Sequence, residues 1–220
     1  YALAMRTICS LLLLVVLTAS AADKHVRRAA SGSQSGADWT NAYTNLPSSL
    51  VRGDVYYIAD GDYTNYTFST AASGTTYCYV VKATASTHGS STGWQDSYAT
   101  STANFPFIAL DQPYFSIDGV TGIGNGARGI KITVQVGNTY GAIIGDFTAQ
   151  STQHHWRIKH VEMTQVDMTF NSAGLYAYMA TAQGDWIDPN LLVDECYIHN
   201  NGGLHVHLII GDYQVFRNNY

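Results

Sequence analysis

Apolar and polar positions alternate in one short phrase that recurs along the second half of the chain. The phrase occupies residues 158–163 and 193–198, begins again at 215–220, and has a looser copy at 117–120. In each copy apolar side chains are separated by charged or polar ones, which is typical of a short strand with one buried face. Such a strand cannot bury its apolar face alone, so the repeated phrase predicts a stack with a shared interior.

The spacing of the copies indicates the architecture. They start at residues 117, 158, 193 and 215, so the intervals of 41, 35 and 22 residues are irregular. Strands of one pattern joined by variable loops rich in Gly, Asn and Asp predict an all-β solenoid of stacked parallel strands. At about 22 residues per coil, which is within the range for solenoid repeats, residues 55–220 would form about seven coils.

Alternating patterns predict further strands before the repeated phrase, and polar stretches predict the loops between them. Residues 84–104 are polar and predict a projecting loop that Trp94 and Tyr98 hold against the surface. The additional strands are expected at 55–59, 66–68, 76–83, 105–110, 114–120, 129–136 and 141–147.

A helix is predicted over residues 38–46, before the first of these strands. Asp38 can cap its start and Pro47 ends it. Because the open end of a solenoid exposes its core, we expect residues 38–50 to act as an N-terminal capping helix. The apolar residues expected on its inner side are Trp39, Ala42, Tyr43 and Leu46.

Residues 1–21 predict a secretory signal peptide. A short positive start at Met5 and Arg6 precedes an apolar run and a small-residue cleavage site, whereas residues 1–4 lie upstream of Met5. A membrane anchor is the alternative, but the apolar run is short for a bilayer. We therefore expect a protein that is secreted, periplasmic or on the cell surface, without stable membrane insertion after cleavage, and a polar linker over residues 22–37.

Composition narrows the classes of partner. Only 12% of the residues are charged, and 16 Tyr and 20 Gly favour strands and turns over helices. With 11 Lys and Arg against 16 Asp and Glu, and no basic patch, nucleic-acid binding is excluded. Neutral or hydroxylated ligands fit this composition better. Cys78 and Cys196 lie in strand-like segments, where two buried thiols are the default expectation and a disulfide is the alternative.

Several segments carry a resemblance to a known family. Residues 35–63 read SGADWTNAYTNLPSSLVRGDVYYIADGDY, and the later segments KATASTHGSSTGWQDSY, YFSIDGVTG, CYIHNNGG and VFRNNY continue the likeness. From about residue 35 onward the chain resembles exported right-handed parallel β-helix proteins of the pectate-lyase-like superfamily. The resemblance implies β-helix coils over 51–220 and a polysaccharide as partner. Because the chain ends inside a repeat phrase, we expect further coils after Tyr220.

Aligning the repeated phrases places Asp118, Lys159, Asp194 and Phe216 in one outward column, and the first three of these side chains are charged. The resemblance implies that Lys or Arg is often the base in β-helix lyases, so Lys159 is the candidate base. Asp118 and Asp194 could be metal ligands, with Ca²⁺ as the possible ion, or structural carboxylates. The alternative is a surface ion ladder, because flanking carboxylates favour protonated Lys159. A second column contains Glu162, Tyr197 and Asn219.

Histidine and arginine residues supply the remaining candidates. The clusters His154, His155, His160 and His199, His205, His207, the latter near Asp212, could bind metal or act as acid and base, or could be polar loop residues. Arg157 and Arg217 could hold a uronate carboxylate or form surface ion pairs. The catalytic candidates are thus Lys159, Arg157 and His199, and the substrate-binding candidates are Tyr197, Arg217, Tyr213, His205 and His207.

Two functions follow from these candidates. One is a secreted lyase that cleaves an acidic polysaccharide by β-elimination. The other is a non-catalytic polysaccharide-binding or cell-surface module. In that case exposed aromatic residues such as Trp94, Tyr197 and Tyr213 would contact the polysaccharide, and Lys159→Ala would not reduce binding.

Overall fold

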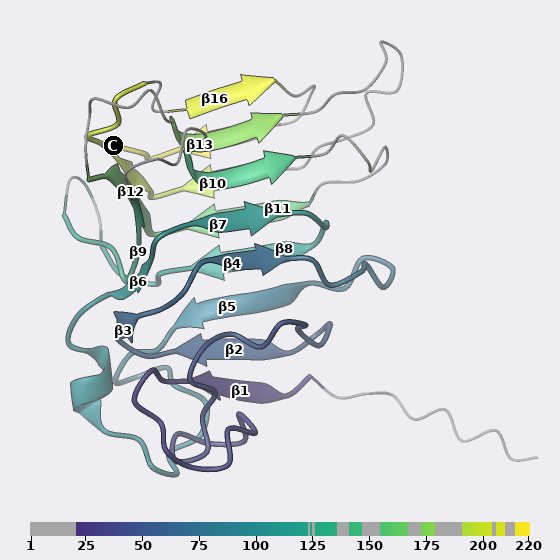
Figure 1. The fold of residues 1–220 in the computed structure, drawn as a ribbon, viewed down its shortest axis with the longest axis vertical. Helices are drawn as coiled ribbons and strands as arrows, with labels where there is room; N and C mark the ends of the chain where they lie inside the picture. The colour runs from purple at the N-terminus through teal and green to yellow at the C-terminus, as the bar shows by residue number, and fades with distance from the viewer. Residues whose placement is uncertain are drawn as a thin grey trace, which may run out of the picture.

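The computed structural model of the chain is all-β, with parallel strands in three sheets (Figure 1). The predicted signal peptide lies outside the described residues, apart from Ala21. Within the described part of the chain, no helix is long and apolar enough to cross a membrane. The structure describes residues 21–122, 124, 126–135, 141–146, 155–166, 173–178, 191–203, 206–209 and 214–220.

In the described residues, the regular elements are short strands and one 3-10 helix. They are β1 (Asp23–Val26), β2 (Val55–Ile58), β3 (Gly61–Asp62), β4 (Tyr66–Phe68), β5 (Cys78–Lys82), η1 (Asp96–Ala99), β6 (Ala103–Phe105), β7 (Ile108–Leu110), β8 (Phe115–Asp118), β9 (Ile130–Val134), β10 (Gly141–Asp146), β11 (Trp156–Lys159), β12 (Val161–Gln165), β13 (Ala173–Tyr178), β14 (Leu191–Asp194), β15 (Tyr197–Ile198), β16 (Val206–Ile209) and β17 (Gln214–Arg217). The strands expected at 55–59, 66–68, 76–83, 114–120 and 129–136 are present with the same or slightly shorter bounds. The single strand expected at 105–110 is wrong, because these residues are divided between the end of β6 and β7, which join different sheets.

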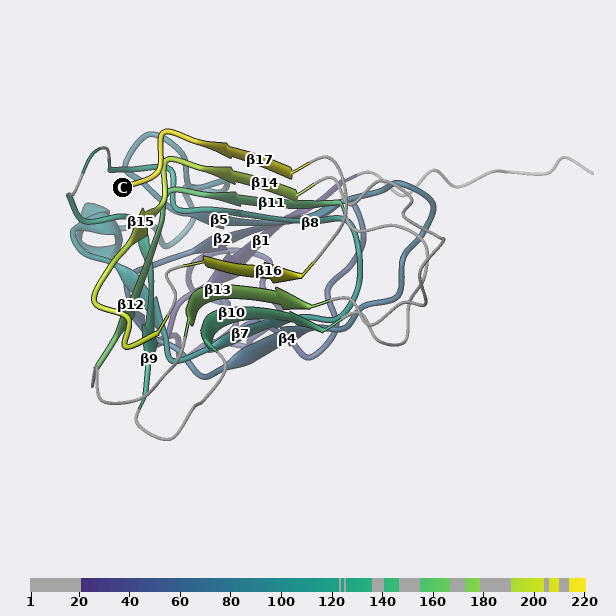
Figure 2. The same ribbon diagram turned by 90° about the horizontal axis from the view of Figure 1, so that it is seen from above.

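Successive strands join different sheets. Sheet A has seven strands in the order β1-β2-β5-β8-β11-β14-β17, sheet B has the order β15-β12-β9-β6-β3, and sheet C has the order β16-β13-β10-β7-β4. From β2 onward, neighbours within a sheet are three strands apart in the chain, so each pass of the chain adds one rung to each sheet. This arrangement is compatible with a parallel β-solenoid, and Figure 2 shows the three stacks around a shared interior.

One apolar cluster runs through that interior from β1 to β15. Sheet A contributes a column of buried side chains, one from each rung from β2 to β14. Each buried aliphatic side chain contributes about 1.5–3 kcal/mol, and it is buried by the rungs above and below rather than by its own strand. The column consists of Tyr56, Val80, Ile117, Ile158 and Val193.

The two cysteines of the described chain are free and buried, as the default expectation had it. Burial raises the pKa of Cys78 to about 11 and that of Cys196 to about 12. Both thiols therefore stay protonated at neutral pH and act as small apolar side chains.

A single left-handed residue marks the corner between sheets A and B. His160, Glu195 and Asn218 have φ of 50°, 54° and 53°. The N–H of His160 donates to the carbonyl of Asp194, and the N–H of Glu195 donates to that of Arg217, so these corners stack in register.

The predicted alignment of the last repeated phrase, residues 215–220, is wrong by one residue. Arg217, not Phe216, pairs with Asp194, and Phe216 follows the inner column of Val193. Val215 and Phe216 are both apolar, so alternation alone could not choose the inward one, and a one-residue slip reverses every side chain. Asn219 shifts accordingly, because the hydrogen bonds of Tyr220 to the strand of Tyr197 give Tyr220 the place predicted for Asn219.

The predicted N-terminal capping helix over 38–50 is wrong, because these residues form bends and an isolated bridge. Asp38 does accept the N–H of Asn41 at 2.8 Å, as a helix cap would. The backbone then turns away, and the N–H of Tyr43 donates to the carbonyl of His25 in β1 at 2.9 Å. Pairing with a neighbouring rung overrides the local helix signal.

The predicted linker over 22–37 contains β1, which pairs with β2 along all four of its residues. It is therefore the first rung of sheet A. Gly36 closes this segment at φ 71°, where a Cβ would lie 2.2 Å from the ring of Tyr43. Both the left-handed backbone and the close ring require glycine here.

The polar loop after β5 packs on an aromatic cluster at the N-terminal end. Trp39 is fully buried, donates its indole N–H to the carbonyl of His88 at 3.0 Å, and contacts Trp94 and Tyr98 at ring distances of 4.8 and 6.1 Å. The expectation that Trp94 and Tyr98 hold this loop is confirmed. Trp94 also stacks on His88 at 4.3 Å, so its ring is engaged in packing.

His25 joins three segments of this end and should make it sensitive to acid. Its Nδ1 lies 3.0 Å from the carbonyl of Gly36, and its Nε2 accepts the N–H of Ser90 at 3.0 Å. These partners assign the neutral Nδ1–H tautomer. Protonation at Nε2 would place two donors face to face, and burial lowers the pKa of His25 below 6.5.

The lowered pKa sets the direction of the pH dependence. Below about pH 6.5 His25 binds a proton in the unfolded chain but not in the folded one. The contribution of His25 to stability is therefore fully present above this pH and is lost as the pH falls toward the pKa of the folded state. We expect the urea midpoint of the wild type to fall more between pH 7.5 and 5.5 than that of His25→Asn, which is less stable at both. Equal falls in the two proteins would contradict this role.

Candidate functional site

The predicted charged column lies on the outer face of sheet A. The strand register aligns Val81, Asp118, Lys159, Asp194 and Arg217 on successive rungs. The order Asp118, Lys159, Asp194 is as predicted, and Arg217 takes the place given to Phe216. The signs alternate from Asp118 onward, so each charge has an opposite charge on the next rung.

Direct contacts show that this column pairs its own charges. Lys159 Nζ lies 3.6 Å from Asp118 Oδ2, and Arg217 Nη2 donates to Asp194 Oδ2 at 2.7 Å. The hydrogen bond from Arg217 holds the pKa of Asp194 below its ordinary value. The arrangement is an ion ladder, in which Lys159 and Arg217 each contact a carboxylate on the neighbouring rung.

Asp118 is occupied by three neighbours. Besides Lys159, its Oδ1 lies 2.8 Å from His160 Nδ1 and accepts the N–H of Val120 at 2.7 Å. Asp194 lies two rungs away with Arg217. Among the residues that the structure describes, no group of three or more His, Cys, Asp or Glu is arranged to hold a metal ion. The Ca²⁺ prediction for Asp118 and Asp194 thus has no third ligand of these types in the described part.

The same face carries a groove of about 350 Å³ that brings together two predicted residues, Arg157 and Arg217. Arg157 is exposed, and its guanidinium lies over the ring of Tyr77 at 4.5 Å. Arg217 is also exposed. The remaining lining residues are His155, Leu191, Leu192 and Val215.

His199, the third catalytic candidate, belongs to a different sheet. It follows β15, stacks on Tyr197 at 3.9 Å, and its Nε2 lies 3.2 Å from Glu162 Oε1. Arg157 and Lys159 share the outer face of β11, across the corner from it. The proposed catalytic trio is therefore not assembled.

Glu162 is the centre of a buried ion cluster on sheet B. Lys131 Nζ lies 2.6 Å from Glu162 Oε1, and the same oxygen also contacts His199 Nε2. Burial alone would raise the pKa of Glu162, but hydrogen bonds from Lys131 and His199 outweigh it and lower the pKa. The carboxylate stays ionised at neutral pH, so this cluster holds β9, β12 and the segment after β15 together.

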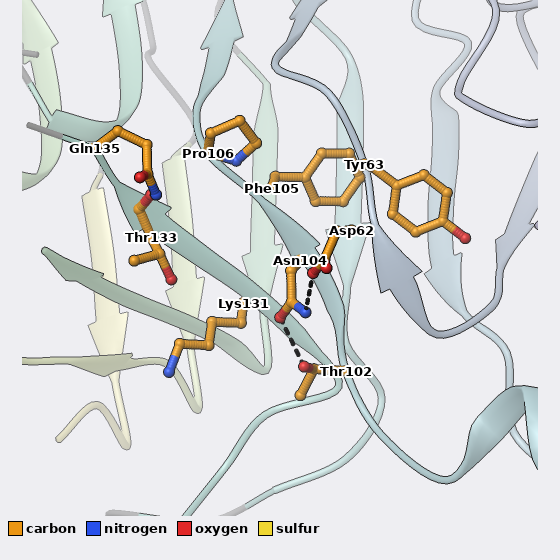
Figure 3. Close-up of a pocket in the computed structure, with 9 residues that line it drawn as sticks. All are labelled: Asp62, Tyr63, Thr102, Asn104, Phe105, Pro106, Lys131, Thr133 and Gln135. Atoms are coloured by element: carbon orange, nitrogen blue, oxygen red, sulfur yellow. Dashed lines mark hydrogen bonds between the residues drawn. The ribbon is translucent and has the colours of Figure 1, made fainter. Parts of the chain in front are cut away.

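A second groove, of about 590 Å³, runs over the outer face of β3, β6 and β9 (Figure 3). Register places Asp62, Asn104 and Lys131 on successive rungs. Sequence reasoning missed this row. Lys131 and Thr133 alternate with buried apolar residues, which marked an outer face, but Asp62 and Asn104 lie too far away in the chain for the row to be recognised. The lining residues are Asp62, Tyr63, Thr102, Asn104, Phe105, Pro106, Lys131, Thr133 and Gln135.

Of the remaining substrate-binding candidates, the structure describes only His207. His205 and Tyr213 lie outside the described residues, as do His154 and Asp212. His207 lies in β16 of sheet C, paired with Tyr176 of β13, and is thus on a different sheet from Tyr197.

Comparison with known proteins adds no assignment. No family model matches the chain, and neither the curated proteins nor the solved structures include a match.

Proposed function

We propose that this chain is an exported, non-catalytic module that binds acidic polysaccharide through the groove of Arg157 and Arg217. The observation that carries the proposal is the presence of both guanidinium groups on one groove of sheet A. We further propose that the sheets belong to a right-handed parallel β-helix of the pectate-lyase-like superfamily. The resemblance of the sequence and the parallel rungs of the sheets support this assignment.

Two arginines on one groove suit a polymer with a carboxylate on each sugar. Their strands, β11 and β17, are separated by β14, so their backbones lie about 10 Å apart at the usual strand spacing. The exposed guanidinium of Arg157 lies over the ring of Tyr77 at 4.5 Å, which holds it at the groove, and a guanidinium can contact a carboxylate through two N–H donors. Leu192 and Val215 supply an apolar floor for sugar C–H groups.

The ion ladder supports binding over β-elimination. A lyase base must reach the sugar proton that it removes, whereas the ammonium of Lys159 lies 3.6 Å from Asp118 within the ladder. Lys159 is therefore proposed to maintain the ladder, with Asp118 and Asp194 as structural partners.

Replacing Arg157 should weaken binding selectively. We expect Arg157→Gln to reduce affinity for oligogalacturonate about tenfold, which corresponds to about 1.4 kcal/mol for one charge-assisted contact. Binding by the wild type should also weaken as salt rises, because exposed charges are screened. Isothermal titration at two salt concentrations measures both effects. Arg157 is preferable to Arg217 as the site of change, because Arg217 also neutralises Asp194.

Two variants serve as controls. Arg28→Gln removes another exposed arginine outside the groove and should bind like the wild type. Lys159→Ala should also retain binding. Ultraviolet absorbance from unsaturated products, lost in Lys159→Ala, would contradict the non-catalytic proposal, and equal affinity of Arg157→Gln and wild type would exclude the groove.

A further inference from the structure

We propose that the groove over β3, β6 and β9 is a second carbohydrate site that takes a neutral oligosaccharide. It lies on sheet B, around the corner from the arginine groove of sheet A, and its lining shares no residue with that groove. The proposal does not depend on acidic polysaccharide binding, because each groove has its own chemistry and can be tested separately.

A directional hydrogen-bond chain crosses the groove from one rung to the next. Thr102 Oγ1 donates to Asn104 Oδ1 at 2.7 Å, and Asn104 Nδ2 donates to Asp62 Oδ1 at 2.8 Å (Figure 3). This chain fixes the orientation of the Asn104 amide. One N–H of the amide and the second oxygen of exposed Asp62 are then oriented for a sugar hydroxyl, which can both donate and accept.

Strand β9 and the residue after it supply a second line of polar groups. Lys131, Thr133 and Gln135 alternate with buried Ile132 and Val134, so all three lie on the outer face and line the groove. The side chain of Gln135 donates to the carbonyl of Thr133 at 2.9 Å, which orients its amide. Neighbouring strands are about 4.8 Å apart, so the two lines face a ligand from adjacent rungs.

The charges of the groove disfavour a polyanion. Lys131 is the one cation among the described lining residues, and its ammonium already contacts the buried carboxylate of Glu162 at 2.6 Å. Asp62 contributes an exposed negative charge. An acidic polysaccharide would meet a neutralised lysine and a repelling carboxylate, whereas sugar hydroxyls match the carboxylate, amides and threonine hydroxyl.

Apolar side chains complete the fit to a sugar ring. Pro106 is half-exposed and lines the groove together with Tyr63 and Phe105, whose buried rings stack on each other at 5.4 Å. A pyranose has hydroxyls around its edge and C–H groups on its faces, so a site with polar edges and an apolar base is complementary to it.

Isothermal titration with cellohexaose, xylohexaose and mannohexaose tests the site. We expect at least one of these neutral hexasaccharides to bind, and Asp62→Asn and Thr133→Val each to weaken that binding at least fivefold. Both substitutions preserve side-chain size, and both positions lie at the surface, so the variants should fold. Near-identical circular dichroism and urea midpoints would verify this.

The arginine groove provides a matched control. Arg157→Gln should leave hexasaccharide binding unchanged, and Asp62→Asn should leave oligogalacturonate binding unchanged. Absence of binding by all three hexasaccharides at millimolar concentration overturns the proposal. Binding that survives both Asp62→Asn and Thr133→Val, or that is lost in Arg157→Gln, also overturns it.

Discussion

Asp60→Asn should destabilise the protein by about 3 kcal/mol, near the lower end of the range for breaking a buried ion pair. Lys82 Nζ lies 2.7 Å from Asp60 Oδ1, and the lysine side chain is only 3% exposed. Lys82 pairs with Ile58 of the neighbouring rung, so its ammonium lies at the edge of the core. Without the carboxylate, a buried positive charge would be left without its counter-ion, although the ammonium also donates to the carbonyl of Ala83 at 3.0 Å.

Asp60 also anchors the polar loop. Its Oδ2 accepts the N–H groups of Thr100 and Ser101 at 2.7 and 2.6 Å. An asparagine oxygen can retain these bonds, so the expected loss reports mainly the charge of Lys82. Urea unfolding measures the loss as a lower midpoint.

Two variants separate the charge from the shape of this pair. Lys82→Met removes the buried charge and keeps the length of the side chain, so it should cost less than Asp60→Asn. Asp62→Asn changes an exposed carboxylate two residues away and should cost about 0.5 kcal/mol or less. If Asp60→Asn had the same urea midpoint as the wild type, the ion pair of Asp60 and Lys82 would contribute little to stability.

Trp39→Ala should cost about 3–5 kcal/mol, the usual range for truncating a buried large aromatic residue. Trp39 is fully buried between His25, at a ring distance of 4.9 Å, and Trp94. Its loss would leave a cavity between β1 and the polar loop, and His88 would lose the indole donor. Urea unfolding followed by circular dichroism measures the change.

Matched aromatic variants sharpen this test. Trp39→Phe keeps a ring and loses the indole N–H, so it should cost less than Trp39→Ala. Trp94→Ala removes a half-buried ring from the same cluster and should also cost less. If Trp94→Ala were the more damaging change, Trp39 would not be the anchor of this end.

The strands could be predicted because alternation is a local property. Residues 66–68 and 130–134 read as strands from their own side chains, and the structure places β4 and β9 there. The helix over 38–46 failed because its decisive contact is not local. Asp38 makes the capping bond, but His25 offers a backbone partner to Tyr43 that no helical pattern reveals.

The candidate sites could be predicted only where the sequence indicated how the strands of neighbouring rungs align. The corner at His160 and its equivalents aligned Lys159 with Asp118 and Asp194, so the ion ladder could be anticipated. The alignment of the last rung was predicted one residue off, because two adjacent apolar residues precede Arg217. The row of Asp62, Asn104 and Lys131 joins residues whose spacing depends on loop lengths, so only the folded rungs reveal it.

Hydrogen–deuterium exchange with oligogalacturonate tests the proposed arginine groove most directly. Bound polymer should slow exchange in residues 155–159 and 214–217 together, because Arg157 and Arg217 line one groove. Exchange over 102–104, on sheet B, should not change. Protection over 102–104 alone, or over neither arginine segment despite measured binding, would contradict the account.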